Sequence, residues 1–373
     1  MLIASVLDPG LFTQDCRRDP TIRALLVDHL MHVAHCHIMI CDQDNLLGKA
    51  IVKGLASLPP CIAQQLSVAF IGDAARIVRL AIPAQDTQSI LDILPDLPLT
   101  ATAMALSNQP GVDATLASQD GYEAIHMTEL PHDRVFSLSS YADSNVKRRE
   151  YDSMGSVSTK DMPQREFCDN IINPFVRWAN KVIMIDKIVA TSFFDHTPGD
   201  QGSNWPIFSR TIKCIYQAWK EECKVEPDSF EIITCPNQMR NWEKPHQSHW
   251  LAEGVQHDYT KQARLIGETL MRDGLTGELR VRLIKTNNLR AVAHDRYLVN
   301  NRSAILNFSR GFDLIHTPQG ILTETAVSLY REREQGSVSR ILTAGDAAVW
   351  ESPALLLAKQ KEANSAVTTD NVL

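Results

Sequence analysis

Residues 292–298 read Val-Ala-His-Asp-Arg-Tyr-Leu, and residues 304–313 read Ala-Ile-Leu-Asn-Phe-Ser-Arg-Gly-Phe-Asp. Both stretches begin with the apolar composition that is typical of β-strands. Side chains alternate along a strand, so His294 and Arg296 are expected to point to the same side. A histidine can attack or bind phosphorus while the neighbouring cation holds the phosphate charge. This stretch therefore predicts a phosphate-directed site on a sheet.

The residues around this stretch, 166–358, have the pattern of an α/β domain. Short apolar runs predict strands, and longer runs with apolar residues on one face predict helices. The expected strands cover residues 182–185, 230–234 and 279–285, and the expected helices cover 207–222 and 260–272. Strands that alternate with helices predict a mixed or parallel sheet flanked by helices.

Residues 1–136 predict a second α/β domain, for which the sequence indicates no family. Its expected strands cover residues 2–7, 37–40, 66–71 and 77–82, and a helix is expected to begin after Asp19-Pro20. Residues 137–165 are polar and rich in serine, which predicts a linker between the two domains. Residues 359–373 predict a polar, frayed tail.

Composition limits the class of protein. The chain has 373 residues and a net charge of −7, which argues against a coat of basic surface but leaves room for a local nucleic-acid patch. The eight cysteines include no C-x-x-C pair, as expected of reduced cysteines in a cytoplasmic protein. No apolar run approaches the roughly 20 residues of a membrane span, and no signal peptide is recognised.

The stretch at His294 resembles the phospholipase D superfamily motif, His-x-Lys-x4-Asp followed by a Gly-Ser turn. His294 matches the nucleophile and Ser309 matches the serine, while Arg296 replaces lysine, Asn301 replaces aspartate and Phe308 replaces glycine. The whole pattern is similar to the degenerate His-Asp-Arg branch found at the C-terminus of microtubule-interacting-and-transport proteins and in bacterial relatives. Members of that branch are viewed as binding modules that have lost the chemistry.

The resemblance covers roughly residues 175–335 and implies recognition of a phosphodiester ligand, with nucleic acid expected first. It implies phosphate contacts from Arg296, Asn301, Ser309 and Arg310, no cofactor, and no hydrolysis. Its bacterial side implies a prokaryotic assembly, such as an antiviral defence system, with a protein partner of the same system. One alternative is a metal-independent homodimeric nuclease that uses His294, because the superfamily needs two motif copies. Another is a structural adaptor in which the motif serves only packing.

Two further groups of residues have weaker signals. Asp8, Asp42 and Asp44 follow expected strands and could gather as magnesium ligands, although aspartate is common in such turns. Histidines and cysteines crowd between His29 and Cys41, but without a recognised zinc spacing. We interpret that run as a helix with polar histidines, with a metal site as the alternative.

Overall fold

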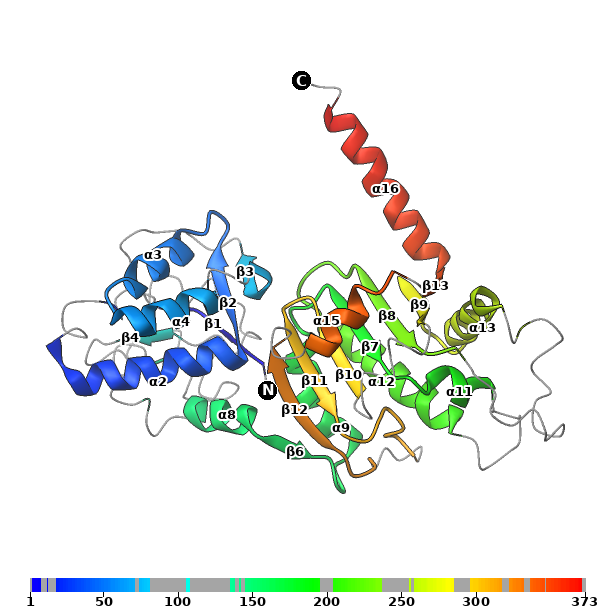
Figure 1. The fold of residues 1–373 in the computed structure, drawn as a ribbon, viewed down its shortest axis with the longest axis horizontal. Helices are drawn as coiled ribbons and strands as arrows, with labels where there is room; N and C mark the ends of the chain where they lie inside the picture. The colour runs from blue at the N-terminus through cyan, green and yellow to red at the C-terminus, as the bar shows by residue number, and fades with distance from the viewer. Residues whose placement is uncertain are drawn as a thin grey trace, which may run out of the picture. The chain divides into compact units, whose positions relative to one another are not determined.

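The computed structural model describes most of the chain. The described residues are 2–7, 12, 18–70, 74–80, 105–107, 135–137, 141, 145–194, 204–236, 255, 258–284, 296–316, 322–331, 336–345 and 347–370. The chain divides into two compact units, residues 1–155 and 156–373. Each unit is mixed α/β (Figure 1), which confirms the predicted class of fold.

Unit 1 contains a three-stranded parallel sheet of order β1-β2-β3. Its main elements are β1 (Ile3–Ser5), α2 (Pro20–Cys36), β2 (His37–Asp42), α3 (Leu46–Leu55), α4 (Pro60–Phe70), β3 (Ile77–Leu80) and α8 (Asn145–Met154), with β4 (Ala105–Ser107) and β5 (Val135–Ser137) paired separately. Helix α2 begins where the Asp19-Pro20 pair predicts, because Asp19 Oδ1 accepts a hydrogen bond from Thr21 N at 2.8 Å.

Two predictions for unit 1 are wrong. Residues 66–70 belong to helix α4, not to a strand, because a short apolar run does not distinguish a buried helix from a strand. The expected linker, 137–165, contains helix α8 and the strand β6 (Ser156–Ser158). Helix α8 was not predicted because its buried face has polar residues, Glu150 and Ser153, and so shows no apolar periodicity in the sequence.

Unit 2 is built on an eight-stranded mixed sheet of order β13-β9-β8-β7-β10-β11-β12-β6. The strands after β6 are β7 (Lys181–Ile185), β8 (Ser229–Thr234), β9 (Leu279–Ile284), β10 (Arg296–Asn300), β11 (Ala304–Phe308), β12 (Ala326–Arg331) and β13 (Ala347–Glu351). Neighbours β7, β8 and β9 run parallel, and every other pair is antiparallel. The sheet predicted for this half of the chain is therefore confirmed as mixed.

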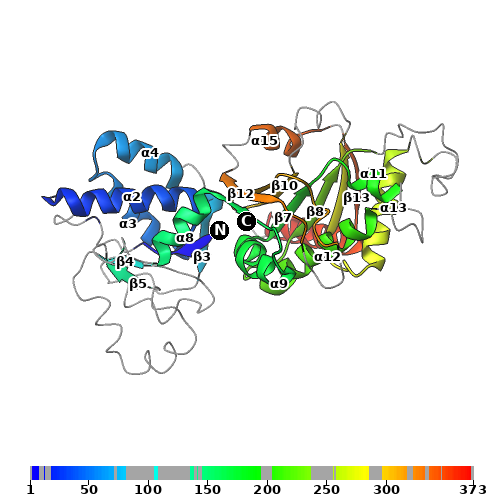
Figure 2. The ribbon, with the colours of Figure 1, turned by 90° about the horizontal axis from the view of Figure 1, so that it is seen from below.

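Helices cover both faces of this sheet (Figure 2). Helix α12 (Trp205–Glu222) joins β7 to β8 and packs Tyr216 and Trp219 against Phe230 of β8. Helix α13 (Tyr259–Arg272) joins β8 to β9 on the same side, where Gly267 leaves room for the Trp350 ring. The opposite face carries an apolar cluster that includes Val338 of α15 (Gly336–Leu342).

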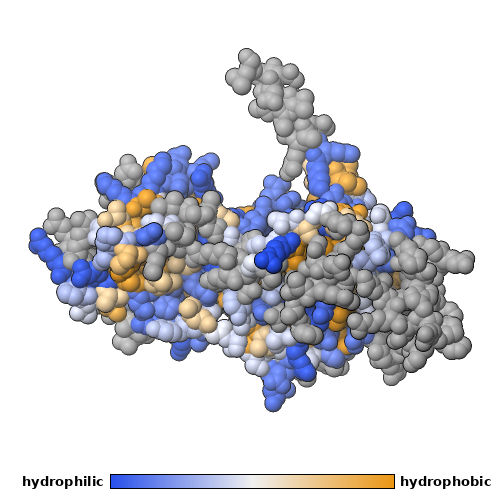
Figure 3. Space-filling model, in the orientation of Figure 1, coloured by the Kyte–Doolittle hydropathy of each residue, from blue (hydrophilic) through white to orange (hydrophobic). Residues whose placement is uncertain are grey.

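The C-terminal segment differs from the predicted tail. Residues 353–370 form the helix α16 (Pro353–Asp370), drawn in red in Figure 1. Leu355 in its first turn is buried, whereas Leu356 and Leu357 are 47% and 58% exposed. On the face that Figure 3 shows, hydrophilic and hydrophobic residues are interspersed among the coloured residues. Among the described helices, none has both the length and the apolar character needed to cross a bilayer.

Candidate functional site

The register of unit 2 gathers four strand ends at one edge of the sheet. Tyr297 of β10 pairs with Ile185 of β7, and Arg296 pairs with Phe308 of β11. The residues that follow β7 and β11 therefore lie beside the first residue of β10. Strand β8 ends at the same edge, because it runs parallel to β7. We call this group of residues, Asp186, Arg296 and Ser309–Asp313, the arginine edge.

A buried carboxylate lies at the centre of the arginine edge. Asp186 Oδ1 is 3.4 Å from Arg296 Nε and accepts a hydrogen bond from Ile188 N at 2.9 Å, while Oδ2 accepts one from Phe312 N at 3.3 Å. Burial raises the pKa of Asp186, and Arg296 with the two backbone N–H groups opposes that rise. The carboxylate thus fixes both the guanidinium of Arg296 and the chain after β11.

Gly311 makes this close approach possible. Its φ of +128° lies in the region that favours glycine. A Cβ at this position would lie 3.0 Å from Asp313 Oδ1 and 3.3 Å from Arg296 Nε. The Ser-Arg-Gly-Phe-Asp sequence therefore needs its glycine both for the turn and for the space beside Arg296.

The two residues before this glycine have different roles. Ser309 Oγ accepts a hydrogen bond from Ala326 N at 3.0 Å and lies 3.2 Å from Thr325 Oγ1. The backbone N of Arg310 donates to the same Thr325 oxygen at 3.2 Å. The backbone of Arg310 is thus held in place, while its side chain is exposed. Ser309 is also exposed, but its hydroxyl holds the loop through its contacts with Ala326 and Thr325. Arg310 is therefore the more direct candidate for a ligand contact.

Of the predicted contacts, Asn301 does not belong to this group. It lies in the turn between β10 and β11, where its Oδ1 accepts a hydrogen bond from Lys181 N at 3.3 Å. Five residue steps separate positions 296 and 301, most of them along the extended strand β10, so the two positions are roughly 16 Å apart. The structure therefore places Asn301 apart from Arg296, because the motif spacing spans the strand from end to end, and a phosphate contact of Asn301 stays a prediction.

Several other predicted residues fall elsewhere. His294, the expected nucleophile, and Asp8 lie outside the described residues. Asp42 is buried at the end of β2. Its Oδ2 accepts a hydrogen bond at 2.9 Å from the backbone N of Leu46, the first residue of α3. Asp44 is exposed in the turn between them. Within the described part of the chain, no group of three His, Cys, Asp or Glu residues is arranged to hold a metal ion.

Unit 1 holds a buried polar cluster that the sequence did not predict. Glu150 Oε1 lies 3.0 Å from His29 Nδ1 and 2.9 Å from His37 Nε2, while Tyr141 donates a hydrogen bond to Oε2 at 2.5 Å. His37 Nδ1 is 2.8 Å from Ser5 Oγ. All five side chains are essentially inaccessible to solvent. We call them the Glu150 cluster.

The charges in the Glu150 cluster follow from its contacts. Burial alone raises the pKa of Glu150, but the close contacts from His29 and His37 outweigh burial and hold the pKa well below its usual range. Burial lowers the pKa of His37 to about 4, so this imidazole is neutral at pH 7. A nitrogen 2.9 Å from a carboxylate oxygen carries the hydrogen, which assigns the His37 proton to Nε2 and leaves Nδ1 to accept from Ser5.

The histidines of this cluster were visible as a His-rich run, but their partner was not. Glu150 comes from helix α8, more than a hundred residues later in the chain than His37. The interpretation as a helix with polar histidines is right for His29, which lies on α2, and the strand expected at residues 37–40 is confirmed as β2, which begins at His37. Only the fold brings the carboxylate of Glu150 into contact with His29 and His37.

A second group of charges lies on the sheet of unit 2. Glu231 of β8 is 1% exposed and has three cations within 4 Å, from Lys181, Arg280 and Arg282. Arg280 also pairs with Glu351 at 3.4 Å. Because these cations share two carboxylates within the fold, this group is less suited to an anionic ligand than the exposed Arg310.

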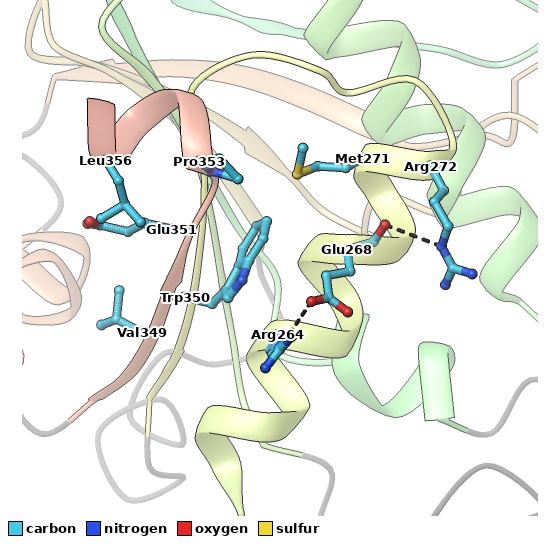
Figure 4. A pocket seen from close by; sticks show the side chains of 9 residues that line it. All are labelled: Arg264, Glu268, Met271, Arg272, Val349, Trp350, Glu351, Pro353 and Leu356. Atoms are coloured by element: carbon cyan, nitrogen blue, oxygen red, sulfur yellow. Dashed lines mark hydrogen bonds and ion pairs between the residues drawn. The ribbon is translucent and has the colours of Figure 1, made fainter. Parts of the chain in front are cut away.

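An open cavity of about 1130 Å³ lies at the far edge of the same sheet (Figure 4). It is bounded by α13, β13 and the first turn of α16, with Trp350 and Met271 among its apolar side chains. Its charged residues are already paired, since Arg264 donates to Glu268 at 2.7 Å. None of the predicted site residues that the structure describes lines it.

Comparison with known proteins adds no family to these observations. Neither the models of known protein families nor the curated proteins include a match to this chain. The function must therefore be argued from the geometry of the arginine edge.

Proposed function

We propose that unit 2 is a phospholipase D-like domain that binds a phosphodiester at the arginine edge without hydrolysing it. Nucleic acid is the first ligand that we expect. One observation carries the proposal: adjacent strands bring Arg296 and Arg310 to the same edge, where one is fixed by a buried carboxylate and the other is exposed. Arginine presents several donors in a rigid fork that matches phosphate oxygens.

The position of this edge in the sheet supports a ligand site. Strand β7 has a parallel neighbour, β8, on one side and an antiparallel neighbour, β10, on the other. In open α/β sheets, ligands bind outside the carboxyl ends of the strands, at the point where the strand order changes direction. Asp186 follows the carboxyl end of β7 at that point. The arginine edge therefore combines a favourable location with the exposed guanidinium of Arg310, while the buried Asp186 pairs with Arg296.

Binding without hydrolysis is the part of the proposal that rests on the motif. The residue at the position of the family's aspartate is Asn301, and it lies at the other end of β10. Asp186 is a carboxylate near the right place, but its oxygens are engaged by Arg296, Ile188 and Phe312. The prokaryotic defence context and the protein partner belong to the same proposal and rest on the resemblance alone.

Titration of the full chain with fluorescent 30-nucleotide DNA and RNA at several salt concentrations tests the proposal. Arg310→Ala should weaken binding and lower the slope of log K against log salt by roughly 0.7–0.9, the value for one lost phosphate contact. The matched control is Arg165→Ala, since Arg165 is an exposed arginine of the same unit with its side chain 93% exposed. Equal affinity and equal slope for Arg310→Ala and the parent protein would refute the binding site.

The nuclease alternative is separated in the same samples. Cleavage that persists in EDTA and disappears in His294→Ala would show that the motif is catalytic and would replace the binding proposal with a homodimeric nuclease. A folded protein that neither binds nor cleaves would favour the structural adaptor.

A further inference from the structure

Two thiols of unit 2 lie in direct contact. Cys168 begins a π-helical turn, η5 (Cys168–Ile172), and Cys214 lies in the middle of α12. Their sulfur atoms are 3.2 Å apart. Cys214 is 5% exposed, while Cys168 is partly exposed. Because the two residues are 46 positions apart in the chain, only the packing of η5 against α12 brings them together.

We propose that Cys168 and Cys214 are a redox modification site at which hydrogen peroxide converts two thiols into an intramolecular disulfide. A disulfide bond is about 2.05 Å long, so the sulfur atoms, now 3.2 Å apart, need to approach by only about 1.1 Å. A small rotation about the Cα–Cβ bonds can supply this movement. The inference is independent of the ligand that the arginine edge binds.

The surroundings of the pair favour one thiolate. Either thiol can donate across the 3.2 Å contact; with Cys168 as the donor, the hydrogen bond lowers the pKa of Cys214 and raises that of Cys168. Gln164 Nε2 also donates to Cys214 Sγ, at 3.4 Å. Because the Gln164 donor supports the sulfur of Cys214, we assign the attacking thiolate to Cys214 and the resolving thiol to Cys168.

The reaction balances with peroxide as the only co-reactant. The Cys214 thiolate attacks one peroxide oxygen, the O–O bond breaks, and the released hydroxide takes up the proton that left Cys214 to form water. The sulfur of Cys168 then attacks the sulfenic acid of Cys214, the S–O bond breaks, and the hydroxyl leaves as a second water with the Cys168 proton. Two thiols are oxidised, and one peroxide is reduced to two waters.

The disulfide would tie η5 to α12. Cross-linking residues so far apart in the chain restricts the unfolded state, and removal of such a constraint is measurable. For a unit of this size, a disulfide is expected to raise the Tm of unit 2 by roughly 5–10 °C. Reduction with dithiothreitol should return the Tm to its starting value.

Peptide mapping tests the proposal directly. The full chain carrying Cys61→Ser, which removes an exposed thiol, is treated with a few equivalents of hydrogen peroxide, alkylated and digested with trypsin without reduction. Trypsin gives peptides 166–177 and 214–220, each with one cysteine. The expected product is these two peptides joined and two hydrogens lighter than their sum, and it should vanish after reduction.

Matched variants define the outcome. Cys168→Ser and Cys214→Ser should each abolish the joined peptides and the rise in Tm, while Cys223→Ser should keep both. Cys223 is a suitable control because it is a half-buried thiol at the end of α12 that donates to Ala179 O and Val225 O. Recovery of peptides 166–177 and 214–220 unjoined from peroxide-treated protein, alkylated or over-oxidised, would overturn the proposal even if a serine variant failed to fold.

Discussion

Replacing Glu150 by alanine should strongly destabilise unit 1. Three buried donors, from His29, His37 and Tyr141, converge on this carboxylate. A buried donor left without an acceptor costs about 1–3 kcal/mol, and here three donors lose the acceptor that they share. Because such losses do not add, we expect about 3–5 kcal/mol, a large part of the roughly 5–15 kcal/mol that stabilises a typical domain.

The distribution of tryptophan provides the assay. The sequence has six tryptophans, all at or after residue 178, so tryptophan fluorescence reports unit 2 alone, whereas far-ultraviolet circular dichroism reports both units. In urea, Glu150→Ala should shift an early part of the dichroism transition to lower concentration and leave the fluorescence transition in place. Asp152→Asn is the matched control, because Asp152 is an exposed acid on the same helix.

Two results would refute the reasoning. A loss below about 1 kcal/mol would mean that the cluster contributes no more than an ordinary surface contact. An equal shift of the fluorescence and dichroism transitions would mean that the units unfold together and that the contacts of Glu150 do not act on unit 1 alone.

Three further results are expected. Burial lowers the pKa of His37 from 6.5 to about 4, and the folded state also holds the pKa of Glu150 below 4.5. Both groups take up protons more readily when unfolded, so the free energy of unfolding of unit 1 should fall as the pH drops from about 6.5 to 4 and further below. A urea midpoint that stays constant over that window would contradict this. Asp186→Ala should shift the fluorescence-detected transition by about 3–5 kcal/mol, because Arg296 loses its buried carboxylate; an unchanged midpoint would show that the pair is not structural. Gly311→Ala should cost roughly 1–3 kcal/mol through its positive φ and should weaken nucleic-acid binding with it; binding and stability equal to the parent would contradict the crowding beside Arg296.

The elements of unit 2 were largely predictable because their buried faces are apolar. The expected strand 182–185 is β7 (Lys181–Ile185), and the expected helix 207–222 is α12 (Trp205–Glu222). In these segments, the residues that the apolar pattern of the sequence places on the inner face are the residues that are buried in the structure. Helix α8 is the opposite case, since it packs through Glu150 and Ser153, and a pattern based on hydrophobicity cannot show such a face.

The candidate site was predictable only in part. The Ser-Arg-Gly sequence indicated a functional turn, and in the fold Arg310 comes two residues after Phe308, which pairs with Arg296. Asp186 was visible as a residue at a strand end, but its pairing with Arg296 spans 110 positions and depends on the order of the strands. The separation of Asn301 from Arg296 has the same origin, because spacing along a strand does not tell which end meets the neighbouring loops.

The strand β6 has a practical consequence for anyone who wishes to excise unit 2. It pairs with β12 as the outermost strand of the sheet, and Thr159 N continues the contact by donating to Thr325 O at 2.9 Å. A fragment begun at residue 166, where the sequence alone would place the domain, would strip this strand away and turn β12 into an uncovered edge. Uncovered edges recruit strands from other molecules. Such a fragment should self-associate, whereas a fragment that begins before Ser156 keeps β6 as the edge strand of the sheet.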